Sequence, residues 1–282
     1  MKFGVTLPIT GVDGDVRKLA ECAALAEKCG WDAVWIEDYV VSFGGENAPV
    51  FDPWLAMTAA AMLTKKIRLG ITVTPLARRR PWKVAREAVT LDHLSNGRLI
   101  LGVGVGMSED ASFANFKEVA DVKQRSEMLD EALEILAGLW SAKPFHFEGK
   151  YYQVAETTFL PPPMQQPRIP IWIGGGWPRK HFTARAKRWD GACPFKVGAD
   201  GNMAMLTADD VREMKATLEA GRKKGAKLDI VVGGATGDLS KKAAAAQTKA
   251  MADAGAIWWS EMTSNKGPAL RKRIRQGPPR FD

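Results

Sequence analysis

The sequence predicts a single (β/α)8 barrel, an α/β fold of the TIM type. Short apolar runs suited to buried strands alternate with helical patterns along the whole chain, and eight such strand–helix units can be counted. A doubly wound sheet is the alternative, but no linker divides the chain into two halves. We therefore expect one domain spanning residues 1–282.

The first four units carry clear start and stop signals. Gly30 ends the first helix, and Asp52 followed by Pro53 is a typical cap and first position of the second. Strands are expected at 2–8, 32–38, 67–75 and 98–106, and helices at 14–30, 52–63 and 80–95.

The second half of the chain begins with an insertion. A long helix at 122–140 is followed by aromatic residues on both sides of Glu148-Gly149-Lys150, which is typical of a small β-hairpin. We place this insertion at about 143–168, between the fourth and fifth strands. The remaining strands are expected at 169–176, 189–195, 229–235 and 256–262, and the helices near 178–188, 207–223, 240–253 and 268–275.

Composition narrows the class of protein. Of the 282 residues, 46% are hydrophobic and 26% charged, which is typical of a globular protein, and no apolar run has the length of a membrane span. The N-terminus lacks the long apolar region of a signal peptide, and the three cysteines do not suggest a disulfide framework, so we expect a cytoplasmic protein. The net charge of +8 is scattered without a nucleic-acid-binding motif, and the three histidines are too far apart to indicate a metal site.

Three glycines alternate in the fourth expected strand. Gly102, Gly104 and Gly106 are spaced by two residues, whereas a dinucleotide-binding loop needs G-x-G-x-x-G. Because side chains alternate across a strand, all three fall on one face and leave it bare. That face makes room either for a ligand or for a bulge or tight interior of the barrel itself.

The stretch RLGITVTPLARRRPWKVAREAVTLDHLSNGRLILGVGVG resembles the bacterial luciferase-like superfamily of flavin-dependent TIM barrels. The stretches IPIWIGGGWPRK and AGAIWWSEM resemble the same superfamily, and the likeness runs from Met1 to about Pro279. The resemblance implies that Gly104 and Gly106, at the C-terminal end of their strand, let backbone lie along the ring system or ribityl chain of a flavin.

The resemblance further implies an oxidoreductase that acts on a small-molecule substrate. We favour an FMN-dependent monooxygenase, in which a separate flavin reductase supplies reduced FMN and oxygen is the second reactant. One alternative is hydride transfer with the deazaflavin coenzyme F420, and another is a flavin-binding protein without turnover. A homodimer is also implied, through the helices after the second and third strands, with no nucleic-acid or membrane partner.

Asp38 and Tyr39 follow the second strand and are the candidate catalytic residues. Members of the superfamily that bind the deazaflavin carry Asp-His at this position, and many that bind FMN carry Glu-His, so Asp38 is also a candidate coenzyme ligand. Tyr39 takes the place of the histidine and donates hydrogen bonds, but is a poor base near neutral pH. Asp38 alternatively serves as a cap or ion-pair partner, and Glu37 is expected to point to the opposite face.

Ile71, Thr72 and Thr74 are candidate coenzyme contacts at the end of the third strand. Members of the superfamily often have a bulge here with a non-prolyl cis peptide, against which the flavin rests, and we place it near Ile71-Thr72. The plain alternative is β-branched residues chosen for strand propensity.

Arg78 and Phe43 are candidate substrate-binding residues. Arg78 begins a run of three arginines that can meet an anionic substrate group or the acidic tail of the deazaflavin, the alternative being a solvated loop. Phe43 lies in the loop 40–51, which together with loops 107–120 and 196–206 is expected to determine the substrate.

Gly174, Gly175, Gly176 and Trp177 are candidate ligands of the coenzyme phosphate. We expect the fifth strand to end near Gly174 and a helix to begin near Pro178, which would direct backbone N–H groups and the positive end of the helix toward an anion. A tight strand-to-helix turn without a ligand is the alternative.

Overall fold

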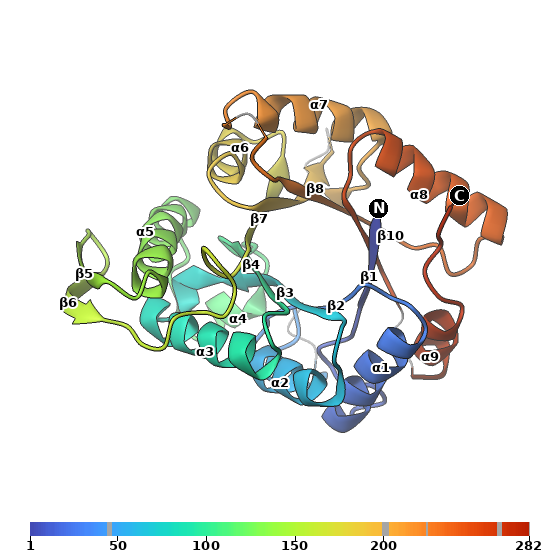
Figure 1. Ribbon diagram of the computed structural model, residues 1–282, viewed down its shortest axis with the longest axis horizontal. Coiled ribbons are helices and arrows are strands. Elements are labelled where there is room, and N and C mark those ends of the chain that lie inside the picture. Colours follow the sequence, from blue (N-terminus) through green and yellow to red (C-terminus); the bar gives the residue numbers. More distant parts are fainter. Residues whose placement is uncertain (44–46, 199–202, 224, 264–266, 282) are drawn as a thin grey trace.

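Eight parallel strands close into a barrel in the computed structural model, which describes residues 1–43, 47–198, 203–223, 225–263 and 267–281. Strand β10 pairs with both β11 and β8, and this pairing closes the ring that Figure 1 shows surrounded by helices. The predicted TIM barrel is therefore confirmed. Its strands are β1 (Lys2–Thr6), β2 (Ala33–Ile36), β3 (Arg68–Pro75), β4 (Leu99–Gly104), β7 (Ile171–Trp177), β8 (Gly191–Val197), β10 (Asp229–Gly234) and β11 (Trp258–Glu261).

The helices form the outer layer, and their starts follow the expected capping rules. The Asp52 carboxylate accepts hydrogen bonds from the backbone N–H groups of Trp54 and Leu55, with Pro53 at the first position. None of the described helices is long and apolar enough to cross a membrane. They are α1 (Val16–Lys28), α2 (Pro53–Leu63), the 3-10 turn η1 (Leu76–Arg78), α3 (Pro81–Leu94), α4 (Ala111–Ala114), α5 (Val122–Trp140), α6 (Lys180–Ala186), α7 (Ala208–Glu219), α8 (Lys241–Asp253) and α9 (Gly267–Arg275).

The expected hairpin insertion is present between β4 and β7. Strands β5 (Pro144–Glu148) and β6 (Gln153–Thr158) pair antiparallel and project beside α5, away from the barrel (Figure 1). The Glu131 carboxylate on α5 holds the turn by accepting backbone hydrogen bonds from residues 150–152. A short strand, β9 (Met203–Ala204), pairs antiparallel with β8.

Three tryptophans fill the middle of the barrel interior. Trp35, Trp172 and Trp258 come from β2, β7 and β11, and their ring centroids lie 5.3–5.6 Å apart. Gly4 and Gly70 on neighbouring strands make room for the Trp35 ring, because a Cβ at either position would overlap it. Alternate residues of the same strands point outward and pack against the helices.

Two predicted boundaries are wrong. Strand β7 continues past Gly174 to Trp177 because residues 174–177 keep pairing with residues 193–196 of β8. The following helix, α6, begins at Lys180 rather than Pro178, and the Trp177–Pro178 peptide bond is cis.

Candidate functional site

The inner face of the barrel carries small residues on several strands at their C-terminal ends. Above the tryptophan layer, five of the residues that share the inward parity are small: Thr6 on β1, Gly104 on β4, Gly174 on β7, Gly233 on β10 and Ser260 on β11. On β8 the inward position at this height is Phe195, beside Gly176. A Cβ built on Gly233 would meet only the Ser260 carbonyl oxygen, at 3.7 Å. This end of a TIM barrel is where ligands bind, and the space suits a flat ring.

A hollow of about 390 Å³ opens at this end beside β1, β2 and β11. Its lining consists of Thr6, Leu7, Pro8, Ile9, Thr10, Glu37 and Thr263. The Thr6 and Ser260 hydroxyls lie 3.3 Å apart, and the Thr263 hydroxyl donates to the Thr6 carbonyl oxygen at 2.6 Å. The hollow therefore presents hydroxyl groups and one carboxyl group to whatever enters it.

The expected bulge interrupts β3, and its cis peptide bond joins Thr72 and Val73, one bond after the predicted position. Ile71 pairs with Leu101 and Thr74 with Val103, so two residues of β3 face one of β4. The Val73 side chain occupies the space above Gly104 and Gly174, where a Cβ would lie 3.0 and 2.7 Å from its methyl groups. These two glycines thus make room for the bulge of the protein itself.

The other residues predicted near this bulge lie at different depths. Thr72 is half-buried, whereas Ile71 and Thr74 are completely buried. Gly106 has a φ of +74°, and a Cβ there would overlap the ring of Phe113 on α4. A glycine is therefore needed at position 106 for the turn after β4. Contact of Gly104, Gly106, Ile71 or Thr74 with a coenzyme stays a prediction.

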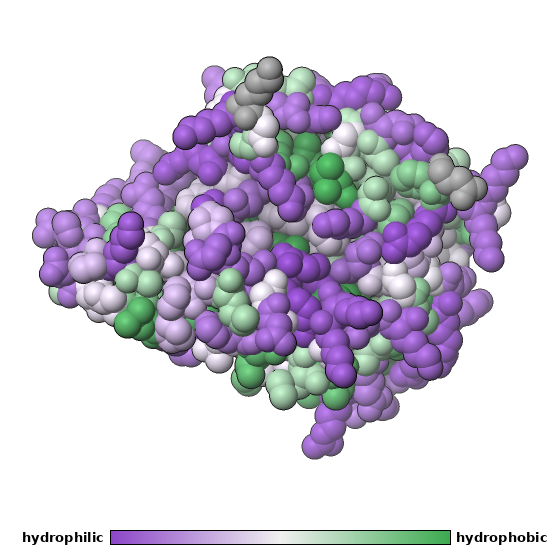
Figure 2. Space-filling model, viewed as in Figure 1, coloured by the Kyte–Doolittle hydropathy of each residue, from purple (hydrophilic) through white to green (hydrophobic). Residues whose placement is uncertain are grey.

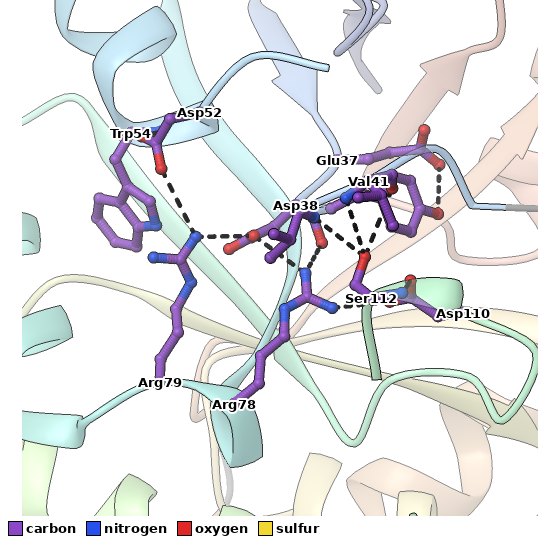
Figure 3. Close-up of polar contacts among 11 residues, drawn as sticks. Glu37, Asp38, Val41, Asp52, Trp54, Arg78, Arg79, Asp110 and Ser112 are labelled. Atoms are coloured by element: carbon purple, nitrogen blue, oxygen red, sulfur yellow. Dashed lines mark hydrogen bonds and ion pairs between the residues drawn. The ribbon is translucent and has the colours of Figure 1, made fainter. Parts of the chain in front are cut away.

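Glu37 and Asp38 point in different directions at the end of β2 (Figure 3). Trp35 points into the barrel, and Glu37, two residues later, lines the hollow and is open to solvent. Asp38 is only 1% exposed and lies on the side of the helices. The expectation that Glu37 faces away from the site is wrong, because the inward parity of Trp35 continues to it.

Asp38 lies in a buried network with two arginines (Figure 3). Its Oδ1 is 2.8 Å from Nη2 of Arg79 and 3.1 Å from Nη2 of Arg78, which also donates to the Asp38 carbonyl oxygen. Nη1 of Arg78 lies 2.7 Å from Oδ2 of Asp110. Because the Arg78 side chain is 2% exposed and held by two carboxylates, it does not present a free charge to an anionic substrate.

The same network joins the loops that follow three strands. Asp110 caps α4 by accepting from the backbone N–H of Ser112, whose hydroxyl accepts from the backbone N–H of Val40 at 3.0 Å. The backbone N–H of Ala111 donates to the Phe43 carbonyl oxygen. Arg78 thereby anchors the loops after β2 and β4 from its place after β3, and the Phe43 ring contacts Tyr39.

Tyr39 is directed toward Glu37. Its hydroxyl donates to Oε1 of Glu37 at 3.4 Å. Burial and the neighbouring Glu37 carboxylate raise the pKa of the Tyr39 hydroxyl well above its ordinary value, so it remains a proton donor at neutral pH. Burial also raises the pKa of the Glu37 carboxyl, although the hydrogen bond from Tyr39 partly opposes this. Solvent reaches this carboxyl, but the surrounding protein atoms reduce its hydration.

The glycine run of β7 does not form one continuous ligand surface. Gly175 faces Phe182 of α6, where a Cβ would lie 2.8 Å from the ring, while Gly176 lies on the opposite face beside Val197. Trp177 is 3% exposed and packs in the outer core. A phosphate at Gly174–Trp177 stays a prediction; Gly176 is buried, and the exposed Arg179 lies beside it.

Sequence reasoning placed Glu37 on the wrong face and missed Asp110. Glu37 could have been found from the parity of Trp35, had the inward face of β2 been known. Asp110 carries a local signal, because an aspartate two residues before Ser112 is typical of a helix cap. Its ion pair with Arg78 has no local signal, because the two residues are far apart in the sequence.

The comparisons with known proteins agree with this architecture. A family model described as luciferase-like monooxygenase matches residues 1–277. A curated relative named F420-dependent glucose-6-phosphate dehydrogenase, from Amycolatopsis mediterranei, is 34% identical over 165 residues, or 57% of this chain. The match spans 48% of that relative, about half of its length.

Two solved structures show the same fold at low identity. The coenzyme F420-dependent tetrahydromethanopterin reductase from Methanopyrus kandleri superposes with a TM-score of 0.76 at 18% identity, covering 97% of this chain and 96% of the other. A monooxygenase from Streptomyces bottropensis superposes with a TM-score of 0.70 at 19% identity, covering 98% and 97%.

Proposed function

Since the chain belongs to the luciferase-like monooxygenase family, whose members are oxidoreductases, we propose that it is an F420-dependent oxidoreductase that transfers a hydride to or from a small organic substrate. The observation that carries this proposal is the open part of the inner face at the C-terminal end of the barrel. Thr6, Gly233 and Ser260 leave room above the tryptophan layer, and Val73 of the bulge forms one border of it.

These residues fit a flat ring system, and the deazaflavin supplies a ring carbon that accepts or donates a hydride. The chain would hold the ring between the bulge at Thr72–Val73 and the open backbone at Gly233. The network of Arg78, Asp38 and Asp110 keeps the surrounding loops in place. The protein thus contributes the position of the coenzyme.

The alternative coenzyme is FMN with oxygen as the second reactant, which the sequence-based prediction favoured. The family and the fold are compatible with both, since the neighbours of the same fold include a reductase and a monooxygenase. The deazaflavin alternative is better supported, because the curated relatives above 30% identity include several named as F420-dependent dehydrogenases.

Coenzyme binding distinguishes the F420 hypothesis from the FMN hypothesis. The purified chain is titrated with F420 and with FMN, and each dissociation constant is measured from the change in coenzyme fluorescence. We expect F420 to bind at least tenfold more tightly. Under anaerobic conditions, at least one member of a panel of alcohols should then reduce the bound F420. This reduction is measured as loss of the absorbance of the oxidised coenzyme. Tighter binding of FMN, with oxygen consumption by the reduced form, would instead support a monooxygenase.

A further inference from the structure

Glu37 is the acidic side chain of the hollow at the barrel mouth. The carboxyl lies on the inward face of the end of β2, and Thr6 and Thr263 contribute hydroxyls to the same lining. Asp38, although adjacent in the sequence, does not line this hollow. Its carboxylate is buried in ion pairs with Arg78 and Arg79. Glu37 therefore has a different task from its neighbour.

The polar groups around Glu37 are suited to a neutral oxygen function. The Tyr39 hydroxyl donates to Oε1 of Glu37, which leaves the second carboxyl oxygen to a ligand. Ser260 and Thr6 hold their hydroxyls 3.3 Å apart on β11 and β1 and are uncharged. A hydroxyl or carbonyl group in the hollow can exchange hydrogen bonds with these groups, since a hydroxyl acts both as donor and as acceptor.

We propose that the hollow binds the hydroxyl or carbonyl group of an uncharged substrate, and that the Glu37 carboxyl takes up or supplies the proton that accompanies the hydride. This inference rests on the proposed hydride transfer. In the oxidation of an alcohol, the O–H bond breaks and its proton goes to Glu37. The C–H bond breaks with its electron pair, which passes as a hydride to the oxidised deazaflavin, and a C=O bond forms. The reduction of a carbonyl reverses each step.

Among the residues that the structure describes, the charges around this hollow argue against a phosphorylated substrate in it. A phosphate beside the Glu37 carboxylate would be repelled, because two like charges at close range raise the energy of both. Arg78 and Arg79 are the nearby arginines expected to attract an anion, and both are ion-paired to Asp38, Arg78 also to Asp110. This substrate class therefore differs from the sugar phosphate in the names of the curated relatives.

The environment of Glu37 also suits proton transfer near neutral pH. Its raised pKa brings the carboxyl closer to the working pH than an ordinary glutamate. Tyr39 is the titratable side chain in contact with it among the described residues, and Arg78 and Asp110 act in turn on Tyr39. Thr6 of β1, which lines the same hollow, and Ser260 of β11, whose hydroxyl contacts that of Thr6, are uncharged.

The first test measures binding without turnover. Protein carrying glutamate labelled with ¹³C at the carboxyl carbon is titrated with cyclohexanol and with cyclohexyl phosphate, and the Glu37 signal is assigned with Glu37→Gln. We expect cyclohexanol to shift this signal and the phosphate to leave it unchanged, while the signal of the surface residue Glu134 does not move. An equal or larger shift with the phosphate, or no shift with cyclohexanol, would overturn the proposal.

The second test measures hydride transfer by the F420-loaded protein with neutral alcohols and ketones. Glu37→Gln should lower the rate at least about a hundredfold while F420 still binds, and should abolish the rise of kcat/KM with pH that accompanies deprotonation of Glu37 during alcohol oxidation. Glu134→Gln is the matched control. A rate within threefold of the parent, or an unchanged pH profile, would overturn the role of Glu37.

The two proposals fail in different ways. If the parent does not bind F420, or transfers no hydride with any substrate, the proposed function is wrong, and the NMR titration alone decides whether the hollow takes neutral hydroxyl compounds. If hydride transfer proceeds normally without Glu37, the proposed function stands and the proton-transfer role is rejected.

Discussion

The inner face of the barrel mouth and the layer just outside it use charge in opposite ways. Inside, Glu37 is open to solvent in a hollow of hydroxyl groups and accepts a hydrogen bond from Tyr39. Outside, Asp38 is buried and held by Arg78 and Arg79. Successive side chains of a strand point to opposite faces, so the adjacent carboxylates of Glu37 and Asp38 have different surroundings. Glu37 is available for chemistry, whereas Asp38 stabilises the loops.

The largest effect is expected from breaking the outer network. Arg78→Met would leave the buried carboxylates of Asp38 and Asp110 without their shared partner, and the free energy of unfolding should fall by about 3–5 kcal/mol. Urea-induced unfolding followed by circular dichroism measures this loss. Arg80→Met, at an exposed neighbouring position, should stay within about 0.5 kcal/mol of the parent. A loss below about 1 kcal/mol for Arg78→Met would show that the network is not a main source of stability.

The second effect compares two glycines of the inner face. A Cβ at Gly174 would lie 2.7 Å from Val73, so Gly174→Ala must displace the bulge and should cost about 1–3 kcal/mol. Gly233→Ala meets only the Ser260 carbonyl oxygen at 3.7 Å and should leave the unfolding free energy nearly unchanged. If the ring lies over Gly233, this second variant should still lower F420 affinity in a fluorescence titration. Equal destabilisation by both substitutions would contradict the distinction between a filled and an open part of this face.

The fold could be predicted from the sequence because its signals are local. The helix at Val122–Trp140 has the expected bounds, and the hairpin after it has its turn at the expected glycine. The inward face of β2 could not be predicted in the same way. Val34, Trp35 and Ile36 are all buried, so the strand shows no alternation of polar and apolar residues. Without that alternation, the orientation of Glu37 and Asp38 depends on the packing of the whole barrel.

The end of β7 shows a second limit of local patterns. Proline is well suited to a helix start, so the sequence favours a helix from Pro178 and a strand that ends near Gly174. In the barrel, residues 174–177 continue to pair with β8, and the glycines make room for Val73 on one face and Phe182 on the other. The ion pair between Arg78 and Asp110 is equally invisible in the sequence, because tertiary packing alone brings these residues together.

The third effect is a pH dependence of opposite sign for two glutamates. Glu27 on α1 accepts hydrogen bonds from the backbone N–H groups of residues 65–67, and these bonds lower its pKa despite the opposing effect of burial. Its contribution to stability is therefore present above the unfolded value of 4.5 and is lost as the pH falls through the folded pKa. Glu27→Gln should lower the unfolding free energy by about 1 kcal/mol at pH 7, and the difference should shrink as the pH falls below 4.5 and through the folded pKa.

Glu37→Gln should behave in the reverse way. Because burial raises the pKa of Glu37 in the folded state, its contribution is fully present below the unfolded value of 4.5 and is lost as the pH rises through the folded pKa. The variant should therefore be as stable as the parent or more stable at pH 7. Thermal unfolding of both variants at pH 3, 5 and 7 checks the two signs, and a destabilised Glu37→Gln at pH 7 would show that this carboxylate stabilises the fold.

The smallest effect on stability is expected on the outermost layer, where we propose a homodimer contact. On α2, Leu55, Met62 and Leu63 are 73%, 66% and 55% exposed and lie on one side of the helix, and Figure 2 shows hydrophobic surface over this helix at the lower edge of the molecule. Leu55→Glu should change the unfolding free energy of the monomer by less than about 0.5 kcal/mol, because the side chain contributes little to the core. It should nevertheless convert a dimer into a monomer by placing a charge in an apolar contact. Light scattering coupled to gel filtration measures the mass, and Leu239→Glu, at another exposed leucine, is the control that should remain dimeric. A monomeric parent, or a Leu55→Glu variant that stays dimeric, would show that this apolar face is not the contact between two copies of the chain.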